Sequence, residues 1–146
     1  MDTIEHDAPR QAVDRQWAAG VHLGAVLAAF MTHWFAGVAG ALVALSVWVL
    51  VRDRYPLAAE HAKEALNFNI TMFIGACAAI AIGIVLFGAT IVTLGLGAIF
   101  TLPAGILLLA LVGVVAVVWV VCSILAAIAG WEGKPYRYPF TLRLVK

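Results

Sequence analysis

Four polar side chains at helical spacing have the clearest chemical potential in this sequence. They follow one another at intervals of four, three and four residues: Glu60, Glu64, Asn67 and Thr71. In a helix this spacing places them on one face, which could form a polar entrance or a docking surface. The alternative is a helix start at a membrane interface, with its charges among lipid headgroups and Asn67 bonded to a neighbouring helix. We call these four residues the polar stripe.

Metal binding by the same segment is a weaker interpretation. His61 lies three residues before Glu64, a spacing that suits a helical metal site. However, di-metal helical bundles need a second helix that carries a carboxylate and a histidine, and none is present. His22 and His33 share roughly one helical face, but they would lie toward opposite sides of a membrane. The sequence therefore predicts no metal site and no cofactor.

Catalytic residues are also missing from the apolar part of the chain. The two serines, Ser46 and Ser123, lie inside apolar runs and outside any nucleophile turn. Chemistry inside a membrane needs ionisable groups at depth, and His22 is the one candidate in the expected spans. A hydrogen bond to a neighbouring helix explains His22 more simply. We expect that the protein is not an enzyme.

Composition identifies the environment of these residues. The chain is 64% hydrophobic and 12% charged, with a mean hydropathy of +1.03, whereas soluble domains are about 45–50% apolar and about 25% charged. No Asp, Glu, Lys or Arg occurs between Glu64 and Glu132, or from Gln16 to Val51. Such runs indicate transmembrane helices. A net charge of +1 argues against a nucleic-acid partner, and the composition excludes a soluble domain or a disordered chain.

The length of the apolar runs predicts an all-α membrane protein with about four transmembrane or membrane-embedded helices. A bilayer core about 30 Å thick takes about 20 helical residues. We expect helices at residues 17–35, 38–51, 65–87 and 103–130. The second helix is short and could form a re-entrant hairpin with the first. The expected organisation is a polar N-terminal tail (1–16), a single helical membrane domain (17–131) and a basic, aromatic, extended tail (132–146).

The basic residues predict the orientation. Every Lys and Arg lies in the N-terminal tail, between residues 52 and 63, or beyond residue 133. Under the four-helix arrangement these three segments are on one side of the membrane, and the positive-inside rule makes that side cytoplasmic. Both termini are therefore expected to be cytoplasmic.

Small residues predict close helix packing in the first span. Gly20 and Gly24 form a small-xxx-small motif, which lets the backbone of another helix approach closely. Ala126 and Gly130 offer a similar face in the last span. The motif is common in membrane helices, so it supports tight packing without identifying the partner.

The C-terminal segment alternates in a way that predicts an extended chain. Apolar and aromatic residues occupy every second position from Tyr136 to Leu144, a period of two, and Pro139 would interrupt a helix. The candidate docking residues of the tail are Tyr136, Arg137, Tyr138, Pro139 and Phe140. The tail could lie along lipid headgroups with its arginines near anionic lipid, pack on its own loop, or add to a partner.

Several of these segments together resemble a known family. The segment from Glu60 to Phe68, His22-Leu23, Arg52-Asp53, Pro56 and the tail from Tyr136 to Phe140 are similar to a family of small bacterial membrane proteins catalogued as a domain of unknown function. That family is distantly related to the Tic-twenty subunit of the chloroplast inner-envelope translocon. The resemblance covers about residues 17–146 and implies a multi-pass protein of the bacterial cytoplasmic (inner) membrane.

Two functional hypotheses follow. The first is a non-enzymatic multi-span protein that serves as a structural or accessory subunit of an inner-membrane assembly. The alternative is an oligomeric channel or a transport or translocation component for ions, small solutes or polypeptide, because the polar stripe could line a wet path. The expected partners are membrane lipid and either further copies of the chain or other membrane proteins, with no nucleic acid.

Overall fold

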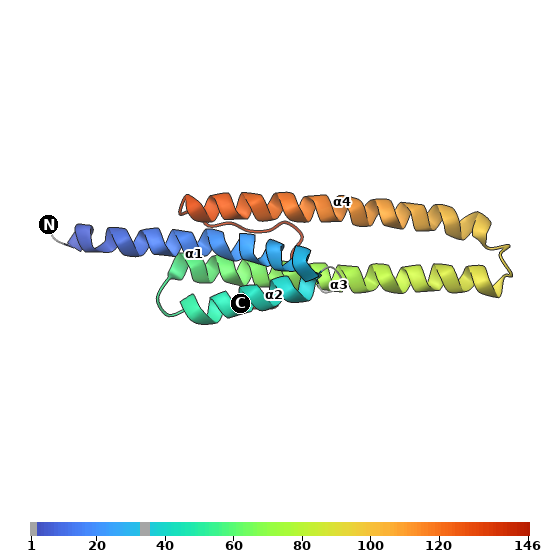
Figure 1. Cartoon of the computed structure of the whole chain (residues 1–146), viewed down its shortest axis with the longest axis horizontal. Helices are drawn as coiled ribbons and strands as arrows, with labels where there is room; N and C mark the ends of the chain where they lie inside the picture. Colours follow the sequence, from blue (N-terminus) through green and yellow to red (C-terminus); the bar gives the residue numbers. More distant parts are fainter. Residues whose placement is uncertain (1–2, 33–35) are drawn as a thin grey trace. The chain divides into compact units, whose positions relative to one another are not determined.

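The computed structural model describes residues 3–32 and 36–146, and these residues contain four helices and no strand. The helices are α1 (Thr3–Thr32), α2 (Ala36–Val51), α3 (Pro56–Val92) and α4 (Ala98–Trp131) (Figure 1). The predicted all-helical fold class is confirmed. His33 and the predicted end of the first helix at residue 35 lie outside the described residues.

Each helix is longer than the helix that the apolar runs predicted. Helix α1 begins at Thr3 and so includes the polar residues that precede the first apolar run. Helix α3 begins at Pro56, a residue that suits a first helical turn because it has no N–H to leave unpaired. Helix α4 begins at Ala98, before Pro103, because the carbonyl of Gly97 accepts hydrogen bonds from the N–H groups of Phe100 and Thr101.

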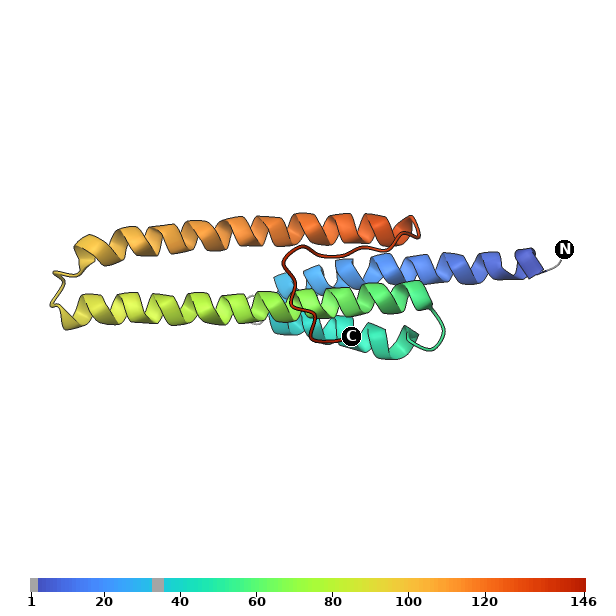
Figure 2. The ribbon, with the colours of Figure 1, turned by 180° about the vertical axis from the view of Figure 1, so that it is seen from behind.

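Contacts divide the chain into two compact units. Unit 1 comprises Met1–Phe73 and Val121–Lys146, and unit 2 comprises Ile74–Val120. Within unit 1, helices α1 and α2 pack on each other, and the C-terminal segment crosses the first part of α3 (Figure 2).

The core of unit 1 is rich in alanine. One cluster joins α1, α2 and α3 through Val21, Ala44, Ala62, Ala65 and Leu66. A second cluster consists of Ala18, Val51, Ala58 and Ala59. Small side chains let helix backbones approach closely, and the larger side chain of Trp48 packs against both clusters.

Glycines mark the closest approaches within unit 1. A Cβ atom on Gly130 would lie 2.8 Å from the carbonyl carbon of Ala18 and from the nitrogen of Ala19. Of the motif residues expected to support packing, Gly24 lies against Val43, where an added Cβ would be 3.3 Å from a methyl group, and Gly20 faces open space. Of the glycines described in unit 1, Gly130 of α4 therefore packs most closely on the backbone of α1.

Unit 2 consists of apolar helix surface and one turn. Leu94 (φ 53°) and Gly95 (φ 90°) reverse the chain between α3 and α4, and a hydroxyl–hydroxyl hydrogen bond of 2.6 Å joins Thr90 to Thr101. The large apolar side chains here are mostly exposed, for example Val92 at 83% and Phe100 at 80%. Exposing so continuous an apolar surface to water is unfavourable. The surface of unit 2 is therefore suited to contact lipid.

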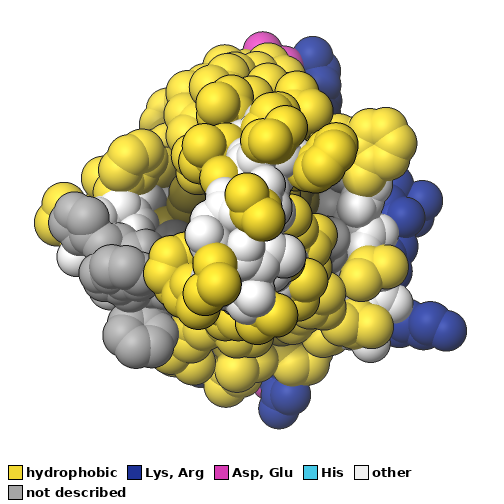
Figure 3. Space-filling model, turned by 90° about the vertical axis from the view of Figure 1, so that its right-hand side faces the viewer, with side chains coloured by type: hydrophobic (Ala, Val, Ile, Leu, Met, Phe, Trp, Pro, Cys, Tyr) yellow, Lys and Arg dark blue, Asp and Glu magenta, His cyan; other side chains and the backbone are white. Residues whose placement is uncertain are grey.

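Two of the helices have the length and composition needed to cross a membrane. They are α3 and α4, and α2 is a shorter apolar helix. Hydrophobic side chains predominate on the face of the molecule shown in Figure 3. These features are those expected of an all-helical protein whose long apolar helices cross a membrane.

Candidate functional site

The C-terminal tail covers most of the polar stripe. After α4 ends at Trp131, the chain turns at Gly133, whose φ of +76° favours glycine, and residues 134–146 continue without helix or strand. This tail contacts α3 through side chains of the stripe. We call Glu64, Asn67 and Thr71, together with His22, His61 and Phe68, the tail-docking surface.

Asn67 binds the last residues of the tail through both the oxygen and the nitrogen of its side-chain amide. Its Oδ1 atom accepts hydrogen bonds from the N–H groups of Leu144 (3.0 Å) and Val145 (2.8 Å), and its Nδ2 donates to the carbonyl of Val145 at 2.9 Å. The side chain is 1% exposed. Asn67 thus supplies the donor and acceptor that a neighbouring strand would offer an extended chain.

Thr71 and Glu64 bind the tail on either side of Asn67. The Leu142 N–H donates to Thr71 Oγ1 at 3.0 Å, while this hydroxyl donates to the carbonyl of Asn67 at 2.7 Å. The two carboxylate oxygens of Glu64 accept from the Tyr138 N–H and from Arg143 Nε, each at 3.3 Å. Three residues of the predicted stripe therefore act as one docking surface for the chain's own tail.

Tyr138 is the buried anchor of the tail. Its ring stacks on Phe68 with centroids 3.9 Å apart and planes 11° apart, and the residue is 3% exposed. Its hydroxyl lies 2.8 Å from His22 Nδ1. A buried tyrosine normally finds such a partner, because an unpaired hydroxyl is costly away from water.

The anchor continues into a chain of hydrogen bonds through two histidines. His22 Nε2 lies 2.8 Å from His61 Nδ1, and His61 Nε2 lies 2.9 Å from the carbonyl of Lys134. The carbonyl can only accept, so His61 must carry its proton on Nε2 and accept on Nδ1. His22 must then donate from Nε2 and accept on Nδ1, and the Tyr138 hydroxyl donates to it.

This assignment satisfies every ring nitrogen and the phenol while both imidazoles are neutral. An additional proton on either histidine would set two N–H groups against each other or remove the acceptor for Tyr138. Burial raises the pKa of the Tyr138 phenol, and the nearby Ser123 hydroxyl has a smaller opposite effect. Tyr138 therefore stays protonated and remains a donor at neutral pH.

Tyr136 forms the next contact along the tail. Its ring meets that of Tyr138 edge to face, with centroids 5.2 Å apart. Burial, followed by the nearby thiol of Cys122, raises the pKa of Tyr136 to about 12. The tail therefore presents two neutral phenols to the helices of unit 1.

The other three candidate docking residues of the tail are not buried. Arg137, Pro139 and Phe140 are exposed, and Phe140 is 99% exposed with a φ of 55°. The left-handed conformation of Phe140 interrupts the alternation expected for a regular strand, so Tyr138 faces inward while Phe140, Leu142 and Leu144 remain exposed. The tail contains no strand, and a turn at residues 139–140 separates residues 134–138 from residues 141–146.

Asp14 is a contributor to this region that sequence reasoning missed. Its carboxylate accepts hydrogen bonds from the N–H groups of Leu57 (3.3 Å) and Ala58 (2.7 Å) at the start of α3. A carboxylate at a helix N-terminus pairs free N–H groups and complements the helix dipole. One feature of the sequence could have indicated this contact. Tyr55, just before Pro56, has no side chain that caps a helix N-terminus, so the capping group of α3 had to come from another part of the chain.

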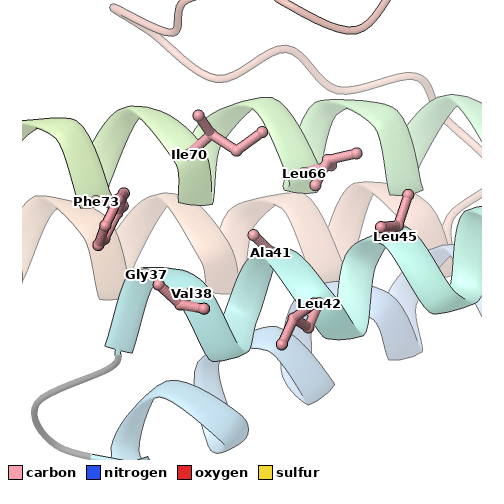
Figure 4. Close-up of a pocket in the computed structure, with 8 residues that line it drawn as sticks. All are labelled: Gly37, Val38, Ala41, Leu42, Leu45, Leu66, Ile70 and Phe73. Carbon is pink, nitrogen blue, oxygen red and sulfur yellow. The ribbon is translucent and has the colours of Figure 1, made fainter.

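Two hollows lie within unit 1, and the second of them adjoins the tail-docking surface. The first is an apolar groove of about 270 Å³ between α2 and α3 (Figure 4), lined by Gly37, Val38, Ala41, Leu42, Leu45, Leu66, Ile70 and Phe73. The second is a charged cleft of about 300 Å³ between α3 and the tail, which includes Glu60 of the stripe. Among the described residues, no group of three or more His, Cys, Asp or Glu side chains is arranged to hold a metal ion.

Comparison with known proteins places the chain in a family. No curated protein and no solved structure matches it significantly. One family model matches residues 13–145, which include all four helices in whole or in part and nearly all of the docked tail. The chain belongs to the magnetosome magnetite crystal formation protein family (MamF/MmsF).

Proposed function

We propose that this protein is a non-enzymatic accessory subunit of the magnetosome membrane that takes part in magnetite crystal formation. The observation that carries the proposal is the family match over residues 13–145. The geometry adds that the most specific buried interactions described in unit 1 hold the C-terminal tail. In this proposal the tail is the working surface, which means the part of the protein that contacts other molecules. The helices hold the tail at the membrane.

The arrangement of the tail supports a role in contacting something outside the chain. Its backbone is fixed by Asn67 and its aromatic anchor by His22. The same fixed segment holds Arg137, Pro139 and Phe140 exposed. Ordering a segment costs conformational entropy, and a segment ordered in advance does not have to be ordered again when it binds.

We further propose a multi-pass arrangement with both termini cytoplasmic, inserted through the bacterial cytoplasmic (inner) membrane. The confinement of Lys and Arg to residues 10–15, 52–63 and 134–146 supports it. Topology reporters fused at residue 8 and after Lys146 should read cytoplasmic, and one inserted near Gly95 should read on the opposite side. A cytoplasmic signal from the Gly95 insertion would contradict this orientation.

The partners in this proposal are membrane lipid and further copies of the chain or other membrane proteins, with no nucleic acid. The exposed apolar side chains of unit 2 support contact with lipid and with other helices. The channel alternative is less favoured, because the polar atoms of Asn67 and Thr71 that could line a wet path bind the tail instead. A distant relationship to the Tic-twenty subunit remains a prediction.

The proposed function can be tested in a magnetosome-forming bacterium that encodes this protein. Deleting the gene should change the size or number of magnetite crystals seen by electron microscopy, and the wild-type gene should restore them. Asn67→Leu, which removes the amide that binds the tail, should restore them poorly. Ser46→Ala is the control, because its hydroxyl bonds only within its own helix.

Both variants should first be shown to reach the membrane at wild-type levels. Unchanged crystals after deletion would overturn the proposed function. Full rescue by Asn67→Leu would keep the protein in crystal formation but exclude the docked tail as its working surface. Fractionation of magnetosomes from the remaining cytoplasmic membrane should find the protein in the magnetosome fraction.

A further inference from the structure

The charged cleft next to the tail-docking surface is formed by segments far apart in the sequence. Its floor comes from α3, and its walls come from the beginning and the end of the tail. The residues that line it are Glu60, Lys63, Glu64, Asn67, Pro135, Tyr136, Arg137, Arg143, Val145 and Lys146. Because both walls belong to the tail, the cleft exists only while the tail is docked.

The charges in the cleft are not balanced within the described chain. Four basic side chains and two carboxylates line it. Arg143 pairs with Glu64 at 3.3 Å. Among the described residues, the three cations Lys63, Arg137 and Lys146 form no ion pair, and neither does the one remaining acidic side chain, Glu60, so positive charge is in excess. Converging like charges repel one another, so an anion in the cleft would relieve this repulsion.

We propose that this cleft binds the phosphate of an anionic phospholipid headgroup. Guanidinium and ammonium side chains bind phosphate through charge-assisted hydrogen bonds, and arginine can bind it through two parallel ones. The cleft volume of about 300 Å³ accommodates a headgroup. Tyr136 also lines the cleft and adds a neutral aromatic side chain beside the charges.

The position of the cleft favours a lipid over a soluble anion. Helix α3 has 37 residues and would be about 55 Å long, well beyond a hydrocarbon core of about 30 Å. Its polar first turns, which form the cleft floor, therefore suit the headgroup layer. Phe140, exposed on the tail between Arg137 and Arg143, is an apolar side chain that a lipid surface would cover.

The test uses the purified full-length protein in a neutral detergent. Thermal unfolding is followed while phosphatidylglycerol, phosphatidylcholine or inorganic phosphate is added at matched phosphate concentration. Phosphatidylglycerol should raise the midpoint in a saturable way, and the other two should change it little. The apparent affinity for phosphatidylglycerol should fall about fivefold in Arg137→Gln, the effect of one surface cation near anionic lipid.

The matched control is Arg54→Gln, which makes the same change of charge at an exposed arginine outside the cleft. It should keep the wild-type affinity. Lys63→Gln is a second cleft variant and should also bind about fivefold more weakly, which keeps the test decisive if Arg137→Gln unfolds without lipid.

Three results would overturn the inference. They are equal stabilisation by phosphatidylglycerol and phosphatidylcholine, an equal loss of affinity in Arg54→Gln, or a matching effect of inorganic phosphate, which would assign the cleft to a free anion. The assay does not involve crystal formation. Its failure would therefore leave the proposed function standing, and failure of the proposed function would leave this binding result standing.

Discussion

The two parts of helix α3 differ in the burial of their side chains. In its first part, His61, Asn67 and Phe68 are buried against other segments of unit 1. In its second part, large apolar side chains such as Ile84 and Phe87 are exposed. The same helical backbone therefore carries one region that finds its partners inside the chain and one whose large apolar side chains stay exposed.

The difference shows how a membrane protein deals with polar groups. Lipid offers no hydrogen-bonding partner, so a polar side chain on a membrane helix needs one from protein or water. The polar groups of the tail-docking surface obtain theirs from the tail. Unit 2 contains few such groups, and the hydroxyls of its threonines donate to carbonyls four residues earlier in the chain. Changes in unit 1 should consequently cost stability, whereas comparable changes in unit 2 should cost little.

The largest expected effect follows replacement of the central histidine. His22→Leu leaves the buried hydroxyl of Tyr138 without its acceptor and His61 Nδ1 without its donor. Each buried group left unpaired costs roughly 1–3 kcal/mol, so the free energy of unfolding should fall by about 3 kcal/mol in total. Thermal unfolding in detergent should show a clearly lower midpoint. A wild-type midpoint would mean that the hydrogen-bond chain is not formed.

A smaller loss should come from filling a close approach between helices. Gly130→Ala places a methyl group 2.8 Å from backbone atoms of Ala18 and Ala19, which cannot rotate away, and overpacking of this kind costs about 2 kcal/mol. The control is Gly113→Ala in unit 2, where an added Cβ meets nothing within 4 Å. Equal effects of the two variants on the unfolding midpoint would remove the contrast between the units.

Releasing the end of the tail should cost less, because part of it can return to water. Asn67→Leu removes three hydrogen bonds to the backbone of Leu144 and Val145, and we expect a loss of about 1.5 kcal/mol. Limited proteolysis should cut the tail faster than in wild type. Glu64→Gln should have a weaker effect, because its partner Arg143 is partly exposed and such pairs contribute about 0–1 kcal/mol. The reverse order would contradict the assigned role of Asn67.

Acidification should loosen the tail by a comparable or smaller amount. Histidines in an unfolded chain take up protons below about pH 6.5, whereas the hydrogen-bond chain is complete only with neutral His22 and His61. Stability should therefore be fully present above that pH and fall by about 1 kcal/mol on lowering the pH to 6. His22→Leu should show a weaker pH dependence of tail proteolysis, and an unchanged dependence would refute this origin.

The smallest expected effect concerns the one described hydrogen bond between the side chains of the two helices in unit 2. Thr90→Val removes the contact with Thr101, and hydrogen bonds between membrane helices average about 0.6 kcal/mol. The unfolding midpoint should shift only slightly. A loss as large as that of His22→Leu would show that unit 2 depends on polar contacts as much as unit 1 does.

Periodicity in the sequence was enough to predict the helices and the shared face of the polar stripe. It could not predict what covers that face, because the partners of Asn67 are backbone groups of Leu144 and Val145, which any residue carries. The glycine motif shows the same limit. Gly20 and Gly130 both belong to small-residue spacings, but only the neighbouring helix decides that Gly130 meets a backbone and Gly20 open space.

The histidines illustrate a second reason. His22, His61 and Tyr138 lie on three segments separated by many residues, so no local pattern joins them. The sequence indicated that His22 needed a hydrogen bond within the protein. It contained no information on distance that would select His61 and Tyr138 as the partners.

The hydrogen-bond chain starts at Tyr138 and returns to the carbonyl of Lys134, so the tail is joined to itself through two helices. The ribosome synthesises the tail after all four helices. His22 and His61 therefore lack their partners in the tail, Tyr138 and the carbonyl of Lys134, while the chain is being made. The ring can close only when α1 and α3 are already side by side. Closure of the ring is thus a late step of biogenesis. A chain that lacks the tail would expose two histidines without their hydrogen-bond partners to membrane-protein quality control.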